Sequence, residues 1–143
     1  MIFMKSKILI GLILILFCSI CTVSADINNI TIPEDYHIAN QTENFTLLES
    51  DQYHSISISI MDNDTDRQLL KQMLEKSMYD FTYEDNFTKG SLDVEENYYN
   101  QEYQRGILYF CDDGDGLIVI DYKVPVLDDL SDSPVEVILD GLA

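Results

Sequence analysis

Apolar and polar residues alternate without a fault in the segment 55–60, where three isoleucines are separated by three serines. Successive side chains of a strand point to opposite faces, so we expect a strand over 54–61 with the isoleucines in the core and the serines in water. Two upstream segments with β-branched, aromatic and aliphatic residues, 30–32 and 45–49, predict two further strands.

A helical period replaces this alternation over 66–79. The apolar residues of the segment fall on one stripe of a helix: Leu69, Leu70, Met73, Leu74, Met78 and Phe81. The residues Thr65-Asp66-Arg67-Gln68 match a capping box at the start of that helix. We therefore expect the helix to pack its stripe on the sheet.

Three more strands are predicted over 92–99, 103–111 and 117–124, with turn residues between them. The continuous apolar run 117–120 indicates a central strand that is covered on both faces. Ser133, Pro134 and Glu136 then combine the features of a helix start, and a last short helix should follow.

The expected element order is β-β-β-α-β-β-β-α. It predicts an α+β fold in which helices pack on one face of a single antiparallel sheet.

The N-terminal 25 residues read as a signal peptide. Lys5 and Lys7 precede a 13-residue apolar run over 8–20, and Val23-Ser24-Ala25 supplies the small residues of a cleavage site. The run is shorter than the roughly 20 residues that span a bilayer. We expect residues 1–25 to be a cleaved leader and 26–143 to be one secreted or cell-surface domain; an uncleaved membrane anchor is the alternative.

Cysteine usage adds little to this picture. Cys18 and Cys21 lie in the leader, so Cys111 is the one cysteine of the mature chain and no internal disulfide can form. We expect Cys111 to act as a small apolar side chain.

Charge narrows the class of partner. The chain has 8 Lys and Arg against 26 Asp and Glu, and the leader holds two of the bases and no acid. The mature domain therefore carries 6 bases against 26 acids, a net charge of −20. Nucleic acid is excluded as a partner, and anionic membrane surfaces are disfavoured, because both are bound through Lys and Arg.

The element order resembles the PsbP-like α+β fold, and the chain is also similar to small secreted proteins of methanogenic archaea. Residues Ile32-Pro33-Glu34-Asp35-Tyr36 resemble the first strand and turn of the PsbP-like group, with Asp35 where glycine is commoner. The resemblance covers nearly all of 27–142. It implies a role in binding or assembly and no catalytic residues.

The N-glycosylation sequon occurs more often in this chain than chance predicts. Five of the six threonines of the mature chain complete an Asn-x-Thr sequon. The acceptor asparagines are Asn29, Asn40, Asn44, Asn63 and Asn86. All five precede residue 89, so the C-terminal half should carry the contact surface, and Tyr98, Tyr99 and Tyr103 are candidates for an aromatic platform that binds sugars or protein.

An acidic turn offers a second kind of site. Asp112, Asp113 and Asp115 lie in a turn with two glycines, and calcium prefers such oxygen ligands, which Asp128 or Asp129 could supplement. The ordinary interpretation of the same residues is a hairpin turn.

Catalytic motifs do not emerge from the sequence. His37 and His54 have no zinc-ligand spacing, and there is no nucleophile elbow or phosphate-binding glycine loop. The leading hypothesis is a non-enzymatic, N-glycosylated domain without a cofactor that binds an extracellular protein or a cell-envelope glycan. A calcium-responsive module and a small hydrolase with paired carboxylates are the alternatives.

Overall fold

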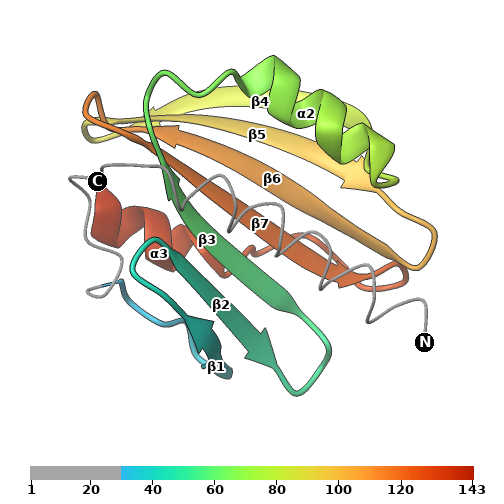
Figure 1. Cartoon of the computed structure of the whole chain (residues 1–143). Helices are drawn as coiled ribbons and strands as arrows, with labels where there is room; N and C mark the ends of the chain where they lie inside the picture. The colour runs from blue at the N-terminus through green and yellow to red at the C-terminus, as the bar shows by residue number, and fades with distance from the viewer. Residues whose placement is uncertain (1–29) are drawn as a thin grey trace.

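The computed structural model describes residues 30–143 as an α+β fold with one seven-stranded antiparallel sheet and two helices (Figure 1). The strands are β1 (Tyr36–Gln41), β2 (Phe45–Ser50), β3 (Ser55–Met61), β4 (Asp80–Lys89), β5 (Leu92–Asn100), β6 (Gln104–Asp112) and β7 (Leu117–Pro125). The helices are α2 (Arg67–Lys76) and α3 (Val135–Leu142).

The sheet has the strand order β1-β2-β3-β7-β6-β5-β4, and every neighbouring pair is antiparallel. The last strand, β7, is the middle strand of the seven, and its residues 117–124 are all buried. The prediction of a central strand covered on both faces is thereby confirmed. Strands β1 and β4 form the two edges.

The two helices lie on opposite faces of the sheet, which corrects the expectation that they share one face. Leu70 and Leu74 of α2 belong to one hydrophobic cluster, with Phe110 and Val119 of the sheet. Val135, Ile138 and Leu139 of α3 belong to the other cluster. The sheet therefore packs against an apolar layer on each of its faces and is the middle layer of three.

The serines of β3 are buried, where the sequence predicted solvent. Ile56, Ile58 and Ile60 lie in the α3-side cluster as expected. Ser55, Ser57 and Ser59 point to the opposite face and are buried there. Alternation identified the two faces correctly, but β3 is an inner strand, so neither of its faces is solvated.

The edge strands are where the predicted elements were wrong. The structure begins the sheet at Tyr36, after the predicted strand 30–32, and it adds β4, which was not predicted at all. Helix α2 ends at Lys76, so Met78 and Phe81 do not continue its stripe. Both edge strands are exposed along most of their length, and a strand without a buried face shows no alternation to detect.

The chain enters β1 through a tight turn. Asp35 has a φ of 70°, a left-handed conformation that glycine adopts without strain and that aspartate tolerates better than most residues. The Tyr36 N–H donates to the Pro33 carbonyl at 3.2 Å. Asp35 is the position at which the sequence departed from the PsbP-like pattern by lacking glycine.

Candidate functional site

The antiparallel sheet has two ends with different surfaces. We call one the sequon end; it comprises the connections 42–44, 62–66, 90–91 and 113–116. We call the other the apolar end; it comprises the connections 51–54, 77–79 and 101–103 and the segment 126–134 that follows β7. In Figure 1 the turns of the apolar end lie toward the right.

The described sequon residues gather at the sequon end. Asn44 and Asn63 lie in its connections, and Asn40 lies near the end of β1. Asn86 lies in the last part of β4, close to the connection 90–91. The fifth sequon is represented by Thr31, whose hydroxyl lies near Gly141 at the end of α3. Gly90 in turn lies beside Ala143, so the end of α3 belongs to the same end of the molecule.

The sequons differ in accessibility. Asn40, Asn63 and Asn86 are exposed, whereas Asn44 is half-buried. Thr46, which completes the Asn44 sequon, is 0% exposed, and its hydroxyl accepts a hydrogen bond from Gln41 Nε2 at 3.3 Å. In the folded protein the Asn44 sequon is thus closed to a modifying enzyme that must reach both residues.

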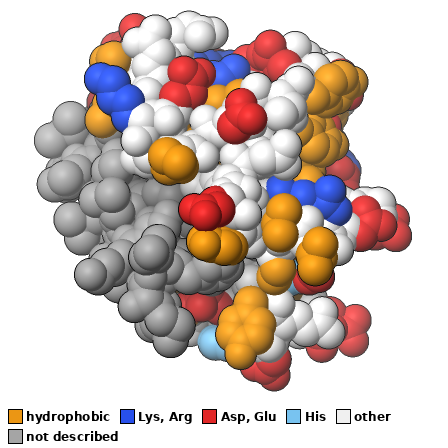
Figure 2. Space-filling view, turned by 90° about the vertical axis from the view of Figure 1, so that its right-hand side faces the viewer, with side chains coloured by type: hydrophobic (Ala, Val, Ile, Leu, Met, Phe, Trp, Pro, Cys, Tyr) orange, Lys and Arg blue, Asp and Glu red, His pale blue; other side chains and the backbone are white. Residues whose placement is uncertain are grey.

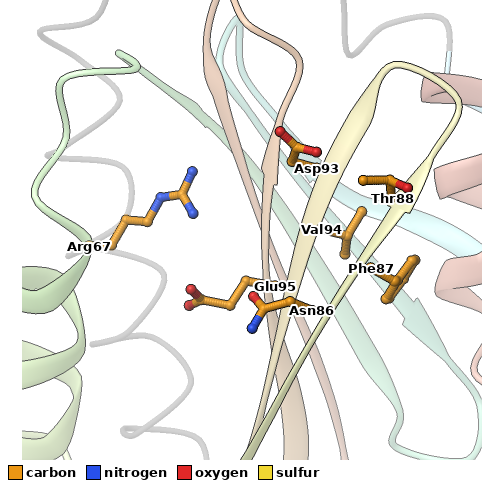
Figure 3. A pocket seen from close by; sticks show the side chains of 7 residues that line it. All are labelled: Arg67, Asn86, Phe87, Thr88, Asp93, Val94 and Glu95. Carbon is orange, nitrogen blue, oxygen red and sulfur yellow. The ribbon is translucent and has the colours of Figure 1, made fainter.

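A cleft of about 350 Å³ adjoins one of the sequons (Figure 3). It lies between the start of α2 and the hairpin of β4 and β5, and its lining includes Asn86, Thr88, Asp93, Glu95 and Arg67. In Figure 3 Asn86 and Glu95 lie side by side, and the guanidinium of Arg67 lies on the opposite wall. The hydroxyl groups of a sugar on Asn86 would meet donors and acceptors here, because the polar side chains of both walls face the cleft.

The apolar end carries exposed hydrophobic side chains. Leu127 is 94% exposed and Tyr53 is 73% exposed. Met78, Tyr103 and Val126 are also exposed. Figure 2 views the molecule from this side and shows hydrophobic side chains in several groups, with acidic and basic side chains between them. Several large exposed apolar side chains gathered at one end of a domain are a feature of interaction sites.

Polar contacts hold the segments of the apolar end together. His54 Nε2 lies 2.7 Å from Asp128 Oδ2, which joins the turn containing Tyr53 to the segment containing Leu127. The Arg105 guanidinium donates to the Asp128 carbonyl, and the Val126 N–H donates to the Tyr103 carbonyl at 3.0 Å. The exposed side chains are therefore presented on segments that are tied to the sheet.

Sequence reasoning did not identify the apolar end. It placed the candidate contact surface on Tyr98, Tyr99 and Tyr103, and it assigned no contact role to His54 or to the segment 126–134. The available signal was the pair Val126 and Leu127, two adjacent aliphatic residues in an otherwise acidic segment. The His54–Asp128 contact joins residues 74 positions apart and has no local signature.

The three tyrosines of the predicted platform do not share one surface. Tyr98 and Tyr99 are neighbours in β5, so their side chains point to opposite faces of the sheet. Tyr99 is 1% exposed, in the α2-side cluster. Tyr103 alone of the three belongs to the apolar end, in the turn between β5 and β6.

The carboxylates of the predicted calcium turn are used within the protein. Asp112 forms an ion pair with Arg67 at 3.2 Å, and its other oxygen accepts from the Gly114 N–H at 2.8 Å. Asp113 Oδ1 accepts from the N–H groups of Asp115 and Gly116, each at 2.8 Å. Asp128 and Asp129 lie beyond the other end of β7 and cannot supplement this turn. Among the described residues no group of three or more His, Cys, Asp or Glu side chains is placed to hold a metal ion.

A buried polar cluster in the core was missed by sequence reasoning. Asp121 of β7 accepts hydrogen bonds from the hydroxyls of Tyr79 and Tyr99, each at 2.5 Å. Lys123 Nζ donates to the Tyr79 hydroxyl at 3.1 Å and lies 4.0 Å from Asp121 Oδ2. The cluster ties the start of β4 and strand β5 to the central strand. Asp121 is the one buried carboxylate among residues 30–143.

The surroundings of this cluster perturb its tyrosines. Burial, and then the charge of Asp121, raises the pKa of Tyr79 and of Tyr99 well above the usual value. Both hydroxyls therefore stay protonated and keep donating to the carboxylate at any physiological pH. Burial similarly raises the pKa of the Cys111 thiol to about 12, which agrees with an apolar packing role for that residue.

The predicted leader 1–25 and Asn29 lie outside the described residues. Between residues 30 and 143 neither helix is long and apolar enough to cross a bilayer.

Comparison of the chain with protein-family models, with curated proteins and with solved structures finds no match. The resemblance to the PsbP-like group therefore stays a prediction.

Proposed function

We propose that residues 26–143 form a non-enzymatic, N-glycosylated domain outside the cell, which binds an envelope or extracellular protein through its apolar end. The observation that carries the proposal is the separation of the two surfaces. The described sequon residues lie at one end of the sheet, and half of the exposed large hydrophobic side chains lie at the other.

The separation supports N-glycosylation because it is a property of the fold and not of the sequence order. Thr31, Asn63 and Asn86 are far apart in the chain, yet the topology brings them to one end. If the asparagines and threonines served only as turn formers, nothing would keep them from the connections at the apolar end. Sugars at one end leave the opposite end open to a partner.

The apolar end supports protein binding because its exposed side chains are large and are held in place. Because the loops that carry these side chains are anchored, little backbone conformational entropy is lost when a partner covers them. The net charge of −20 of the mature chain keeps such a domain soluble and favours partners that are neutral or basic at the contact. A cell-envelope glycan is the other class of partner, and Tyr53 and Tyr103 are the rings that would stack on it.

The test uses glycopeptide mapping of the secreted protein, followed by capture from the envelope fraction of the source organism. We expect sugar at Asn40, Asn63 and Asn86, and none at Asn44 if the sugar is added after folding. Sugar at Asn44 as well would mean that modification precedes burial of Thr46. Secreted protein without sugar at any of these positions would contradict the glycosylation part of the proposal.

For the contact, Tyr103→Ser combined with Leu127→Ser should lower retention of the envelope partner at least about tenfold, the loss expected when two central anchors are removed. Leu69→Ser is the matched control, because Leu69 is also an exposed leucine but lies on α2, away from the apolar end. Equal retention by the double variant and the control would contradict the assigned contact surface.

A further inference from the structure

The sheet has two open edges, and each edge strand carries a sequon. Strands β1 and β4 are outermost, and both are exposed along most of their length. Asn40 lies in β1 and Asn86 lies in β4, and both side chains are exposed. An exposed edge strand is a template on which another chain can add a strand.

Strand β4 is the longer template of the two. It has 10 residues, from Asp80 to Lys89, and runs alongside nearly the whole of β5. Its open side presents backbone groups that nothing in the sheet uses; the Asn86 N–H donates to the carboxylate of its own neighbour, Asp85, at 2.9 Å. A strand of this length, with the exposed Tyr83 in it, would ordinarily be prone to pair with a second copy.

Both edges already show the irregularities that discourage pairing. The register of β1 shifts between Ile38 and Asn40, and that of β4 shifts between Phe81 and Tyr83. In β1 the shift lies directly beside Asn40. In β4 the shift lies near the apolar end, and the regular part that remains contains Asn86. In β4 this regular part extends from Tyr83 to Lys89. The irregularity of β4 therefore protects only the start of that edge, and its long regular part needs another protection.

We propose that N-linked sugars at Asn40 and Asn86 guard the two edges of the sheet and prevent strand pairing between copies of this protein. Asn86 pairs with Glu95 and Asn40 pairs with Leu47, so both side chains project on the α2 side of the sheet. A strand added to either edge would have to place its own side chains on that side, beside the sugar. A sugar chain excludes it by volume, and the cleft beside Asn86 holds the first sugar residues close to the edge.

This inference rests on the N-glycosylation part of the proposed function, and its test keeps the two apart. The secreted full-length protein is compared with Thr42→Ala combined with Thr88→Ala, which removes both edge sequons while keeping the asparagines. Thr42→Ser combined with Thr88→Ser keeps both sequons and controls for the changed side chains. Thr65→Ala removes the Asn63 sequon from a loop and controls for the loss of sugar as such.

Three measurements are made on each protein: glycopeptide mapping, mass by light scattering over a range of concentrations, and amide hydrogen exchange of β1 and β4. We expect the double alanine variant to show at least about a twofold rise in mass, as edge pairing gives a dimer or a larger assembly. The rise should be accompanied by slower exchange in Asp80–Lys89. The serine variant and Thr65→Ala should keep the oligomeric state of the unaltered protein, with Thr65→Ala lighter only by the sugar that it loses. Asn40→Gln combined with Asn86→Gln removes the same sugars by another route and should behave as the double alanine variant does.

Absence of sugar at Asn40 and Asn86 in the unaltered protein would overturn this inference together with the glycosylation proposal. Sugar at both positions, with no rise in mass in either the double alanine or the double glutamine variant, would overturn the edge-guard role alone. A rise in mass without slower exchange in either edge strand would also overturn it, because the copies would then meet elsewhere.

Discussion

At the scale of single residues, Gly106 is the position at which the packing leaves no room for a side chain. A Cβ built there would collide with the Tyr122 carbonyl and would lie 2.5 Å from the Tyr99 hydroxyl. The end of the Tyr99 ring fills the space that a side chain at position 106 would occupy. From there its hydroxyl donates a hydrogen bond to Asp121. The glycine is thus a condition for the buried polar cluster.

We predict that Gly106→Ala destabilises the protein by about 3 kcal/mol, as overpacking against backbone is added to a disturbed buried hydrogen bond. Chemical unfolding monitored by circular dichroism measures the loss. Gly116→Ala is the matched control, because the nearest atom to its added Cβ is the Met61 carbonyl oxygen at an ordinary 3.5 Å. Similar losses in the two variants would show that crowding around Tyr99 is not the cause.

The residues of the buried polar cluster could not have been identified from the sequence. Asp121 follows an apolar run and looks like the polar end of a strand, yet it is buried with two tyrosines and a lysine around it. Its partners come from β5 and from the residue before β4, and β4 was itself not predicted. The sequence shows which residues are polar, whereas the pairing of strands decides which of them meet.

At the scale of elements, the inner strands and both helices were predictable, and the edge strands were not. Strands β3, β5, β6 and β7 coincide closely with their predicted ranges, because burial imposes a period on the sequence. Helix α2 begins within one residue of its predicted start and ends three residues early, at Lys76. In β4 only Phe81 and Phe87 are apolar residues that are partly buried, so the strand shows no hydrophobic period. The assignment of the helices to faces also failed, since an amphipathic stripe does not state which face of a sheet it will cover.

The sequence also misplaced the residue that caps the start of α2. The sequence predicted a capping box that begins at Thr65, but the N-cap is Asp66, whose carboxylate accepts from the Leu69 N–H at 3.1 Å. We predict that Asp66→Ala lowers the free energy of unfolding by about 1 kcal/mol, the typical effect of losing such a cap. Thermal or urea unfolding provides the measurement. Asp64→Ala changes a neighbouring exposed carboxylate outside the helix and should cost much less; an equal loss would assign the effect to charge and not to the cap.

At the scale of the whole molecule, the sequence predicted the sequons but not their arrangement. The acceptors precede residue 89, which suggested a division between the two halves of the chain. The structure divides the molecule by the ends of its sheet, because β4 returns Asn86 to the end at which Asn40 and Asn63 already lie. The contact surface that we propose accordingly differs from the predicted tyrosine platform, and its residues Tyr53, Tyr103 and Leu127 come from three separate connections.

The buried tyrosines make the stability of the folded protein depend on pH in the alkaline range. Burial raises the pKa of Tyr79, Tyr99 and Tyr109 above the usual value in the folded protein. In the unfolded chain these groups ionise near pH 10, at about the value of a free tyrosine. Above that pH the unfolded state binds fewer protons than the folded state, so stability that is fully present at neutral pH is lost as the pH rises.

We predict that the free energy of unfolding falls above about pH 10, each such tyrosine contributing up to about 1.4 kcal/mol per pH unit. Urea unfolding between about pH 8 and pH 11, with tyrosinate absorbance recorded in parallel, measures the slope. Tyr109→Phe should reduce the slope by the contribution of one group. Ser133→Ala is the matched control, because it removes the 3.0 Å hydrogen bond to the Tyr109 hydroxyl while keeping the titrating group, and it should lower stability without changing the slope. A stability that stays constant to about pH 11 would contradict the prediction, since it would mean that these hydroxyls ionise as readily in the folded core as in the unfolded chain.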